Sequence, residues 1–573
     1  MRRLRWQLII IFLTGLVVGI LLLGEQPVVS PLQTPEPIRG GIYSEALVGS
    51  LERLNPVLDF NNPVDHDIDR LIFNGLVRFD SRGVPQPDLA ESWGISEDGT
   101  IYNFSLRQNI KWHDGEALTS DDVLFTVDFL RNGGEYIPED IQAFWKEVEV
   151  VNSPQDPNTL QFRLPEPFAP FLDYLTFGIL PRHLLDGLSI DDLVNDPFNL
   201  HPIGTGPYRF DRLIVENGQI IGVILKSFDG YFGKPAFIDQ LVFRYYTDSV
   251  SAFEAYQEGT VQGIGQVTSD ILAQVLAQPG LSVYTGREPK LSIIFLNLKN
   301  PQLPFFSDPK VRNALLMGLN RQRMINQLIQ GQAIIANGPI LPGTWAYYNN
   351  LKSIPYDKEA AIQLLKDSGY VLSGEDQTVR KKENTELSFK LSYPDTDFHR
   401  GLAEAIQRDW EALNIQVELE PVPYDQLITT RLAPRSYDAV LIDINFSRTP
   451  DPDPYPFWDQ SQATGGQNYS QWDNRLASEY LEQARITLDI TDRERLYRNF
   501  QVIFKDELPA LPLYFPVYSY AVSSEVQGVQ LGPLFDTSDR FLTVANWYLM
   551  ATRNKPAALQ PSATSTVSTT SQP

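Results

Sequence analysis

The chain has 573 residues, 43% hydrophobic and 11% aromatic, so it is long enough to form two or three domains with ordinary cores. Its 71 acidic and 47 basic residues give a net charge of -24, which argues against nucleic acid or an anionic membrane surface as the main partner. Cysteine is absent, which excludes disulfides, thiolate metal sites, a cysteine nucleophile and a lipidated cysteine anchor.

Residues 1–24 have the features of an export segment. Three arginines among the first five residues precede an apolar run over 8–23. Counted from Trp6, roughly 18 residues at about 1.5 Å each extend about 27 Å, just enough to span a bilayer. No A-x-A-like cleavage site follows the run. We therefore expect an uncleaved signal anchor, with a cleaved signal peptide as the alternative, and a body in the periplasm or on the outer face of the cell membrane.

Two further segments are expected to lie outside the fold. Residues 25–37 are rich in proline and lack periodicity, which indicates an extended spacer. Residues 551–573 are rich in serine and threonine, a composition typical of a disordered tail.

The segment 83–131 shows the clearest signals in the chain for where predicted strands, turns and helices begin and end. Tyr102, Phe104 and Leu106 alternate as a strand with one buried face. Turns follow at Asn109 and at residues 113–115. Thr119 with Asp122 three residues later is a capping box, and we expect a helix after it.

Strands and helices then alternate, which is typical of α/β lobes. Residues 160–164 alternate as a strand, and residues 291–298 form a nearly continuous apolar strand suited to a sheet covered on both faces. Further along we expect a helix from Ser307 or Asp308 to Gly331, a helix over 357–369, a helix and a strand within 398–422, a helix capped by Thr491 and Glu494, and a last strand over 541–549.

The sequence offers no catalytic or metal-binding pattern. The five histidines are far apart, with no close-spaced ligand motif. We interpret Asp65-His66-Asp67 as a solvated helix start and His113 as a hydrogen-bonding turn residue. Residues 204–208 (GTGPY) lack the Lys-Ser/Thr of a phosphate loop, and no G-x-S-x-G elbow occurs. Acid pairs at 121–122 and 191–192 suit helix caps. We therefore expect no enzyme activity, no cofactor and no metal.

Residues 436–460 carry the best candidate for a binding surface. Residues 439–444 form a short apolar strand interrupted by Asp443, followed by the proline-rich acidic and aromatic stretch DPDPYPFW. Prolines fix such a loop at low entropic cost, and its rings offer flat apolar surface. We interpret the loop as one wall of a ligand cleft; the alternative is a solvated loop whose aromatic side chains cover the edge of a lobe.

A series of short sequence motifs, in one order along the chain, resembles that of the extracellular solute-binding proteins of family 5, the peptide and nickel transporter type. The resemblance covers about 38–550 and rests on LNP (54–56), GLV (75–77), PDLAESW (87–93), LRQNIKWHDGEALTSDDV (106–123), ILPRH (179–183), GTGPY (204–208), VRNAL (311–315), LLKDSGY (364–370), DPDPYPFW (451–458) and RERLYRNFQ (493–501).

The resemblance implies an α/β, two-lobed periplasmic-binding-protein-like fold of type II, with an extra subdomain inserted in the N-terminal lobe. It also implies that the protein is a monomer that delivers its solute to an ABC transporter permease. The corresponding ranges here are lobe I over 38–76, 201–287 and 509–550, the insert over 77–200, and lobe II over 288–508.

Family members that bind peptides hold an extended ligand between the lobes by strand-like pairing to backbone. By resemblance, the two backbone walls fall a few residues after LNP and on the strand before DPD, with a cleft aromatic in the returning strand. These positions, together with the DPD loop, are Phe60, Asn61, Asn62, Asp443, Ile444, Asn445, Phe446, Ser447, Asp451, Trp458 and Tyr514.

One departure bears on the ligand. Peptide-binding relatives often read W-x-x-D after the second strand, the acid pairing the α-amino group of the ligand. Here Ile444 takes the Trp position and Ser447 the acid position, with Asp443 or Asp451 as substitutes. We expect a binder of peptides or peptide-like solutes, with an oligosaccharide or nickel-chelate binder as the alternative within the family. From another class, the alternative is a surface-anchored enzyme or a peptide-holding chaperone.

Overall fold

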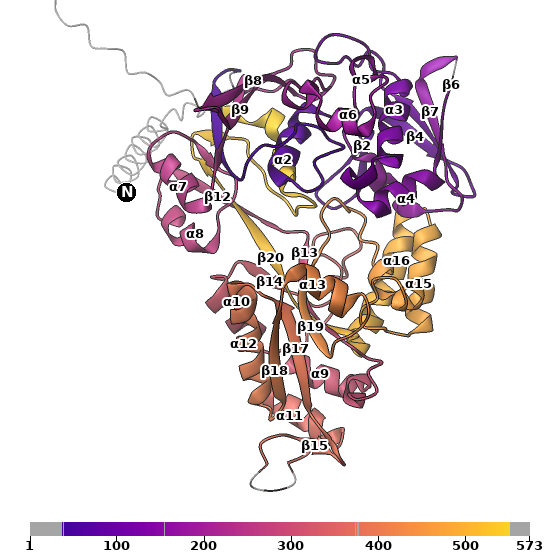
Figure 1. The fold of residues 1–573 in the computed structure, drawn as a ribbon, viewed down its shortest axis with the longest axis vertical. Helices are drawn as coiled ribbons and strands as arrows, with labels where there is room; N and C mark the ends of the chain where they lie inside the picture. The colour runs from indigo at the N-terminus through magenta and orange to yellow at the C-terminus, as the bar shows by residue number, and fades with distance from the viewer. Residues whose placement is uncertain (1–36, 38, 154, 373, 375–376, 551–573) are drawn as a thin grey trace, which may run out of the picture.

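A computed structural model describes residues 37, 39–153, 155–372, 374 and 377–550. The chain forms two lobes, one above the other in Figure 1, with the first half of the chain and its C-terminal end in the upper lobe. The predicted signal anchor, most of the predicted spacer and the predicted tail lie outside the described residues. Within the described residues, no helix is long and apolar enough to cross a membrane.

One large sheet runs through both lobes. In the described residues its path has lower-lobe strands at one end and upper-lobe strands at the other. The order is β18 (Gln416–Val422), β17 (Ser388–Pro394), β19 (Ala439–Asn445), β13 (Lys290–Leu296), β20 (Ala510–Ser523), β11 (Gly263–Ile264), β1 (Ile42–Val48), β10 (Gln240–Tyr246), β9 (Gln219–Ser227) and β8 (Tyr208–Glu216), while β12 (Leu281–Arg287) and β14 (Ala333–Ile335) pair with β20 beside this path.

Two segments connect the lobes. Strand β20 pairs with β13 of the lower lobe at its start and with β12 of the upper lobe toward its end. Strands β12 and β13 follow one another in sequence and pass from the upper lobe to the lower one beside β20 (Figure 1). Because both crossings are extended backbone, a change of dihedral angles in a few residues can swing the lobes as rigid bodies.

The lower-lobe sheet is covered on both faces, as the apolar run at 291–298 predicted. Leu291, Ile293 and Phe295 of β13 join one hydrophobic cluster, whereas Ile294 and Leu296 join another on the opposite face. The helices that follow along this lobe are α9 (Pro309–Met317), α10 (Arg321–Leu328), α11 (Lys358–Asp367), α12 (Asp397–Glu411), α13 (Tyr424–Gln426), α14 (Tyr455–Trp458), α15 (Arg475–Ile486) and α16 (Ile490–Glu507).

The segment expected to be an insert carries its own antiparallel sheet in the upper lobe. Its strand order is β4 (Ala90–Ile95), β5 (Ile101–Leu106), β7 (Asp156–Arg163) and β6 (Glu149–Ser153). The segment also contains the hairpin β2 (Val77–Phe79) and β3 (Pro85–Pro87), with helices α3 (Ser120–Arg131), α4 (Glu139–Glu147), α5 (Arg182–Leu185) and α6 (Ile190–Val194). One continuous core joins it to the rest of the upper lobe, which adds α2 (Pro63–Ile72), α7 (Ser249–Gln257) and α8 (Ser269–Leu276). The domain boundaries stay a prediction.

Local signals placed several helix starts correctly. The Thr119 and Asp122 capping box is formed, with the backbone N–H of Thr119 2.8 Å from the Asp122 carboxylate. Asp308, not Ser307, caps α9, and its side chain accepts from the N–H of Lys310. Asp192 is likewise part of a capping box with Ser189. Short-range hydrogen bonds decide such positions, so the sequence narrows each helix start to a few residues.

The single helix expected over 308–331 is wrong, because two helices occupy that range. Helix α9 ends at Met317, and Asn320 starts α10 by accepting from the N–H of Arg323. The backbone N–H of Asn320 donates to the carboxylate of Asp409 on α12, at 2.8 Å. This tertiary hydrogen bond holds the break in place, which no periodicity in the sequence reveals.

Two further expectations are wrong. Asp489, not Thr491, caps α16, because its carboxylate accepts from two backbone N–H groups. The strand expected over 541–549 is instead 3₁₀ helix and turn up to Asn546, and only β22 (Tyr548–Leu549) pairs, with β21 (Val526–Gln527). The side chain of Arg540 fixes this segment through buried ion pairs with Glu45 and Asp67. The remaining hairpin is β15 (Lys381–Lys382) with β16 (Thr385–Glu386).

Candidate ligand cavity between the lobes

A cavity of about 440 Å³ lies where the two lobes face each other. The upper lobe supplies helix α2, the segment before it, the insert and the 535–539 segment, and the lower lobe supplies the loop after β19. Residues that line it include Asp59, Phe60, His66, Asp69, Leu130, Asp140, Trp145, Phe168, Asp173, Tyr174, Phe177, Asn445, Phe446, Arg448, Asp451, Asp453, Phe457, Arg485, Phe535 and Asp536.

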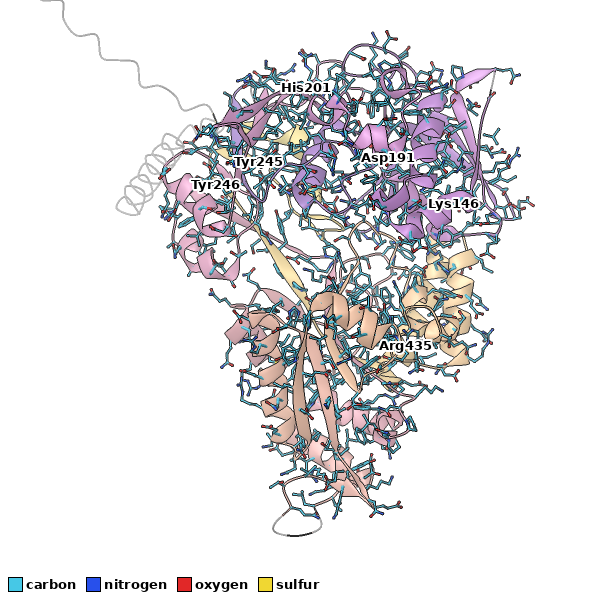
Figure 2. The ribbon with its side chains drawn as sticks, viewed as in Figure 1. Lys146, Asp191, His201, Tyr245, Tyr246 and Arg435 are labelled. Atoms are coloured by element: carbon cyan, nitrogen blue, oxygen red, sulfur yellow. The ribbon has the colours of Figure 1, made fainter. Side chains whose placement is uncertain are left out.

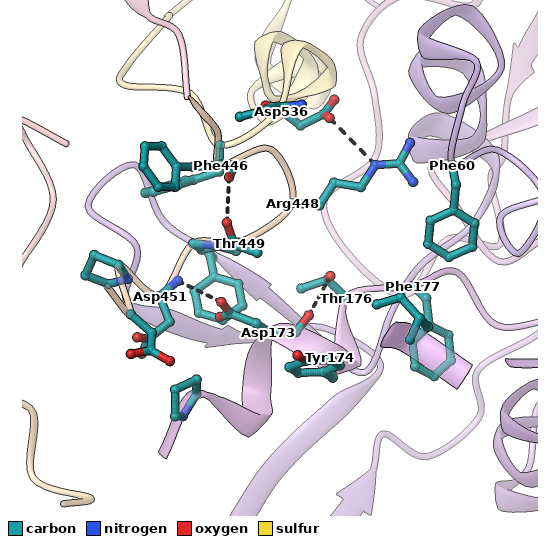
Figure 3. Close-up of a pocket in the computed structure, with 18 of the residues that line it drawn as sticks. Phe60, Asp173, Tyr174, Thr176, Phe177, Phe446, Arg448, Thr449, Asp451 and Asp536 are labelled. Atoms are coloured by element: carbon teal, nitrogen blue, oxygen red, sulfur yellow. Dashed lines mark hydrogen bonds and ion pairs between the residues drawn. The ribbon is translucent and has the colours of Figure 1, made fainter. Parts of the chain in front are cut away.

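The insert supplies much of the aromatic wall. The 3₁₀ helix over Ala169–Leu175 brings Tyr174 to the cavity, and Phe177 follows it (Figure 3). The rings of Tyr174 and Phe144 stack with centroids 3.7 Å apart, which fixes the orientation of Tyr174. Phe60 and Phe446 line the same cavity from other segments. The cavity therefore offers large flat apolar surfaces on several sides.

Arg448, in the loop after β19, joins the two lobes across the cavity. Its guanidinium donates to the carboxylate and to the backbone carbonyl of Asp59, both at 2.9 Å. Its Nε lies 3.8 Å from Asp536, and its guanidinium carbon lies 5.5 Å from the Phe60 ring centroid. The φ angle of Arg448 is +63°, a conformation that residues with a side chain rarely adopt.

His66 completes this group, which we call the latch (Asp59, His66, Arg448 and Asp536). Its Nδ1 lies 2.7 Å from Asp59 and its Nε2 lies 3.5 Å from Asp536. Burial tends to raise the pKa of both carboxyls, but the charges of His66 and Arg448 outweigh it and hold both pKa values below 3.8. Both carboxylates are therefore ionised at neutral pH, and the latch carries two negative charges against one permanent positive charge.

A second contact links the insert to the lower lobe. The backbone N–H of Asp451 donates to the Asp173 carboxyl at 2.8 Å, and the Asp451 carboxylate forms a bidentate ion pair with buried Arg493. Burial, together with the charge of Asp451, raises the pKa of Asp173 well above its ordinary value. The DPD loop is thus held by contacts from both lobes.

Arg485 orders the rest of the DPD loop. Its guanidinium lies 2.9 Å from Asp453, 4.2 Å from the ring centroid of Tyr455 and 5.0 Å from that of Phe168. Because Phe168 belongs to the insert, this stacking also spans the two lobes.

The interpretation of Asp65-His66-Asp67 as a solvated helix start is wrong. Asp65 and Asp67 are only 1% and 6% exposed. Asp65 accepts from the backbone N–H groups of Glu52 and Arg53, both at 2.9 Å, and Asp67 pairs with Arg540. Burial nevertheless raises the pKa of Asp65 to about 7. Through these hydrogen bonds and ion pairs, the two acids hold helix α2 in place behind the cavity.

The predicted site residues divide into two groups. Phe60, Asn445, Phe446 and Asp451 line the cavity, whereas the other predicted residues do not. Asn62 caps α2 through its side chain, and its backbone carbonyl accepts from the N–H of His66. The remaining predicted residues outside the lining are Asn61, Asp443, Ile444, Ser447, Trp458 and Tyr514.

Five of those six have identifiable surroundings in this conformation. Trp458 is 2% exposed and packs edge-on against Phe504, with centroids 4.7 Å apart. Tyr514 is buried in the core of the lower lobe, as is Ile444. Asp443 faces His399, with 3.8 Å between Oδ2 and Nε2, and the Ser447 hydroxyl donates to the Asn445 side chain. Whether any of them touches a ligand stays a prediction.

Sequence reasoning missed Arg448 and the aromatic residues of the insert. Arg448 directly follows Ser447, at the point where the motif of the relatives was already seen to change, so a charge at the next position was an available signal. The stretch FAPFLDYLTF (168–177) concentrates four aromatic residues within ten positions, which was a second available signal.

The histidines contact other protein groups in the structure. Figure 2 shows His201 at the top of the upper lobe, where it packs against Phe210. In the parts of the chain that the structure describes, no group of three or more His, Asp or Glu side chains could hold a metal ion. His113 is a buried hydrogen-bonding residue, as predicted, because its ring bonds to the backbone of Gly204 and Gly206.

The two lobes, the two extended crossings and the cavity between them define a two-lobed solute-binding protein. Residues 84–467 match the bacterial extracellular solute-binding proteins, family 5. The chain belongs to this family, whose members are extracytoplasmic binding proteins.

Individual relatives agree with this assignment. The dipeptide-binding protein of Escherichia coli (strain K12) is 29% identical over 517 residues, covering 85% of this chain and 91% of that protein. The structure of HbpA2 from Haemophilus parasuis superposes with a TM-score of 0.77 at 22% identity, covering 89% of this chain and 100% of that chain. The oligopeptide-binding protein AppA from Bacillus subtilis, solved in complex with a nonapeptide, superposes with a TM-score of 0.65 at 23% identity, covering 90% and 100%.

Proposed function

We propose that this protein captures peptides or peptide-like solutes between its lobes and delivers them to the permease of an ABC importer. The cavity of about 440 Å³ between the lobes carries this proposal, since sites for small molecules typically measure about 300–1,000 Å³ and combine apolar walls with a few polar groups. The similarity to the dipeptide-binding protein of Escherichia coli supports the choice of peptide.

Strand β19 offers a way to hold a peptide backbone. It pairs with β13 along its whole length, but with β17 only at Ala439 and Val440. Among the described residues, its second edge therefore has no strand partner from Leu441 onward, and its end at Asn445 and Phe446 lines the cavity. We infer that a ligand main chain pairs near this end, with side chains directed at the aromatic walls.

The latch suggests how closure is coupled to binding. Arg448 already donates a hydrogen bond to the Asp59 carboxylate across the cavity, so the lobes are held together before a ligand arrives. The α-amino group of an incoming peptide can replace a cationic partner of the latch, and its α-carboxylate can replace an anionic partner, because each end of a peptide carries the same sign of charge as the group that it replaces. The same groups would then close the lobes around the ligand, in the manner of a hinge clamp.

Native mass spectrometry of the purified full-length protein tests the ligand class. We expect a mixture of peptides to be released, whereas a discrete sugar or a nickel chelate would overturn the peptide proposal. Arg448→Gln is expected to reduce the retained peptide, and Arg431→Gln, which removes an ion pair within the lower lobe, should not. Hydrolysis of a substrate panel that one point substitution abolishes would contradict a binding protein altogether.

Attachment to the membrane through the N-terminal segment is a further part of the proposal. The apolar run over 8–23 supports an uncleaved anchor, which would keep the binding lobes beside the permease. Intact mass measurement of the protein from membranes is expected to find the N-terminal segment retained. A mature chain that begins near residue 25 would show cleavage instead.

A further inference from the structure

A second cavity, of about 390 Å³, lies within the upper lobe. It is bounded by helix α2, the β2–β3 hairpin, the loop over 231–234 and the C-terminal segment over 538–546. Arg70, Phe73 and Ser538 line both this cavity and the one between the lobes, so a single layer of side chains separates the two. Nothing in the proposed transport function uses this second space.

Four cationic side chains line this second cavity, which we call the basic pocket: Arg70, Arg78, Arg107 and Lys234. Arg70 lies 3.8 Å from Asp539. Within the described residues, the other three have no carboxylate partner within 4.0 Å. In hydrogen bonds, Arg78 and Arg107 use only their Nε atoms, on the backbone carbonyls of Pro87 and Asp88, and the guanidinium carbon of Arg107 lies 5.7 Å from the Phe232 ring centroid. Lys234 donates to the side chain of Asn546.

Few carboxylates offset the positive charge of the basic pocket. Asp88 is the one carboxylate among the lining residues, and it is 8% exposed. Both of its oxygens accept from the side-chain amide of Asn74, at 3.1 and 3.2 Å. Counting Asp539 on Arg70 as well, the four cations face two carboxylates. A local excess of positive charge in a chain of net charge -24 indicates a site for an anion.

The walls of the basic pocket restrict the kind of anion. Phe232 and Tyr231 stand with ring centroids 4.7 Å apart, and Phe541 and Val544 add apolar surface from the C-terminal segment. The Nη groups of Arg78 and Arg107 have no hydrogen-bond partner among the described residues, and such planar forks match the oxygens of phosphate and carboxylate. The volume is also larger than an inorganic ion needs.

We infer that the basic pocket binds a small organic anion, with its phosphate or carboxylate group on the arginines and its apolar part against the rings. This site is separate from the cavity between the lobes, because Arg78, Arg107 and Lys234 do not line that cavity.

Calorimetric titration of the full-length protein in detergent tests the inference, with ionic strength matched by sodium chloride. The probes are phenyl phosphate, benzoate and inorganic phosphate. We expect saturable binding of at least one of the two ring-bearing anions, tighter than that of inorganic phosphate. The comparison of phenyl phosphate with benzoate identifies the preferred anionic group.

Substitutions locate the binding. Arg78→Gln and Lys234→Gln should each weaken the affinity about tenfold, the loss expected for one charge-assisted hydrogen bond. Arg209→Gln is the matched control, because Arg209 is an exposed arginine of the same lobe outside the pocket, and it should leave the affinity unchanged. Circular dichroism of each variant checks that it is folded.

Three outcomes would overturn the inference. They are the absence of saturable binding, an equal loss in Arg209→Gln, and affinity retained in both folded pocket variants. The last result would place the anion elsewhere, for instance on Arg448 between the lobes.

Discussion

Asp69 lies on helix α2, where it lines the cavity between the lobes yet is only 2% exposed. Neither oxygen of its carboxyl has a hydrogen-bond partner of normal geometry among the described residues. Burial raises the pKa of Asp69 well above 3.8, and the charges of Asp59 and Asp65 raise it further. The folded protein therefore keeps this carboxyl protonated at pH values where the unfolded chain has ionised it.

The sign of the stability effect follows from that shift. The contribution of Asp69 is fully present below a pH of about 3.8 and is lost as the pH rises through the folded-state pKa. Asp69→Asn removes the titration with almost no change of shape, so we expect it to raise the melting temperature more at pH 8 than at pH 5. Asp140→Asn, at an exposed acid of the same cavity, is the control for thermal scans at both values. A gain for Asp69→Asn that does not depend on pH would contradict this account.

Trp458 illustrates how a family motif can mix binding and core residues. It belongs to the DPDPYPFW stretch, but its ring is enclosed by Phe295 and Phe504 of the lower-lobe core. We expect Trp458→Ala to lower the free energy of unfolding by about 3–5 kcal/mol, the usual cost of a large cavity in a core. Urea denaturation measures this loss. Phe457→Ala, beside it but in the cavity lining, should cost less stability and more ligand affinity.

At the scale of elements, the GTGPY stretch acts as a support for helix α2. The N–H of Gly206 donates to the carbonyl of Ile72 at 2.7 Å, at the C-terminal end of that helix. A Cβ atom on Gly206 would lie 2.3 Å from the carbonyl oxygen of Leu71, and one on Gly204 would lie 2.0 Å from that of Ile72. The glycines therefore permit a close approach of two backbones.

Gly206→Ala should consequently destabilise the upper lobe by about 1–3 kcal/mol, the range for overpacking a filled site. Chemical denaturation followed by tryptophan fluorescence gives the value. Gly218→Ala is a useful control, since no atom lies within 4 Å of its Cβ position, although its φ of +79° adds local strain. An unaffected Gly206→Ala variant would mean that α2 can shift, and with it Asp69 and the latch.

At the scale of the whole molecule, we expect the latch to limit how often the lobes separate. Arg448→Gln removes the charge that joins Asp59 and Asp536 across the cavity. Hydrogen bonds to charged groups contribute about 1.5–3 kcal/mol each, so we expect the open form to gain about tenfold or more in population. Small-angle scattering of the ligand-free protein should show a larger radius of gyration.

The control for this experiment is Arg431→Gln, because the Arg431–Glu420 pair lies within the lower lobe, at 2.9 Å. Its scattering curve should match the parent protein. If Arg448→Gln also matched it, the contacts of Asp451 and Arg485 with the insert would be sufficient to hold the lobes together.

The sequence by itself determined the local elements and the family. Capping residues such as Thr119 and Asp308, the two-sided apolar strand at 291–298 and the ordered words from LNP to DPDPYPFW depend on neighbours within a few residues, so they can be read from the chain. The same reasoning found Phe60, Asn445, Phe446 and Asp451, four residues that line the cavity.

Only the tertiary structure decided the rest. The burial of Asp65 and Asp67, the break between α9 and α10, the enclosure of Trp458 and the bond from Arg448 to Asp59 all join segments that are distant in sequence, the last across 389 positions. Charge and hydrogen-bonding partners set the role of such side chains. Because a linear pattern records each residue but not its partner, it predicted a cleft and could not predict the latch that spans it.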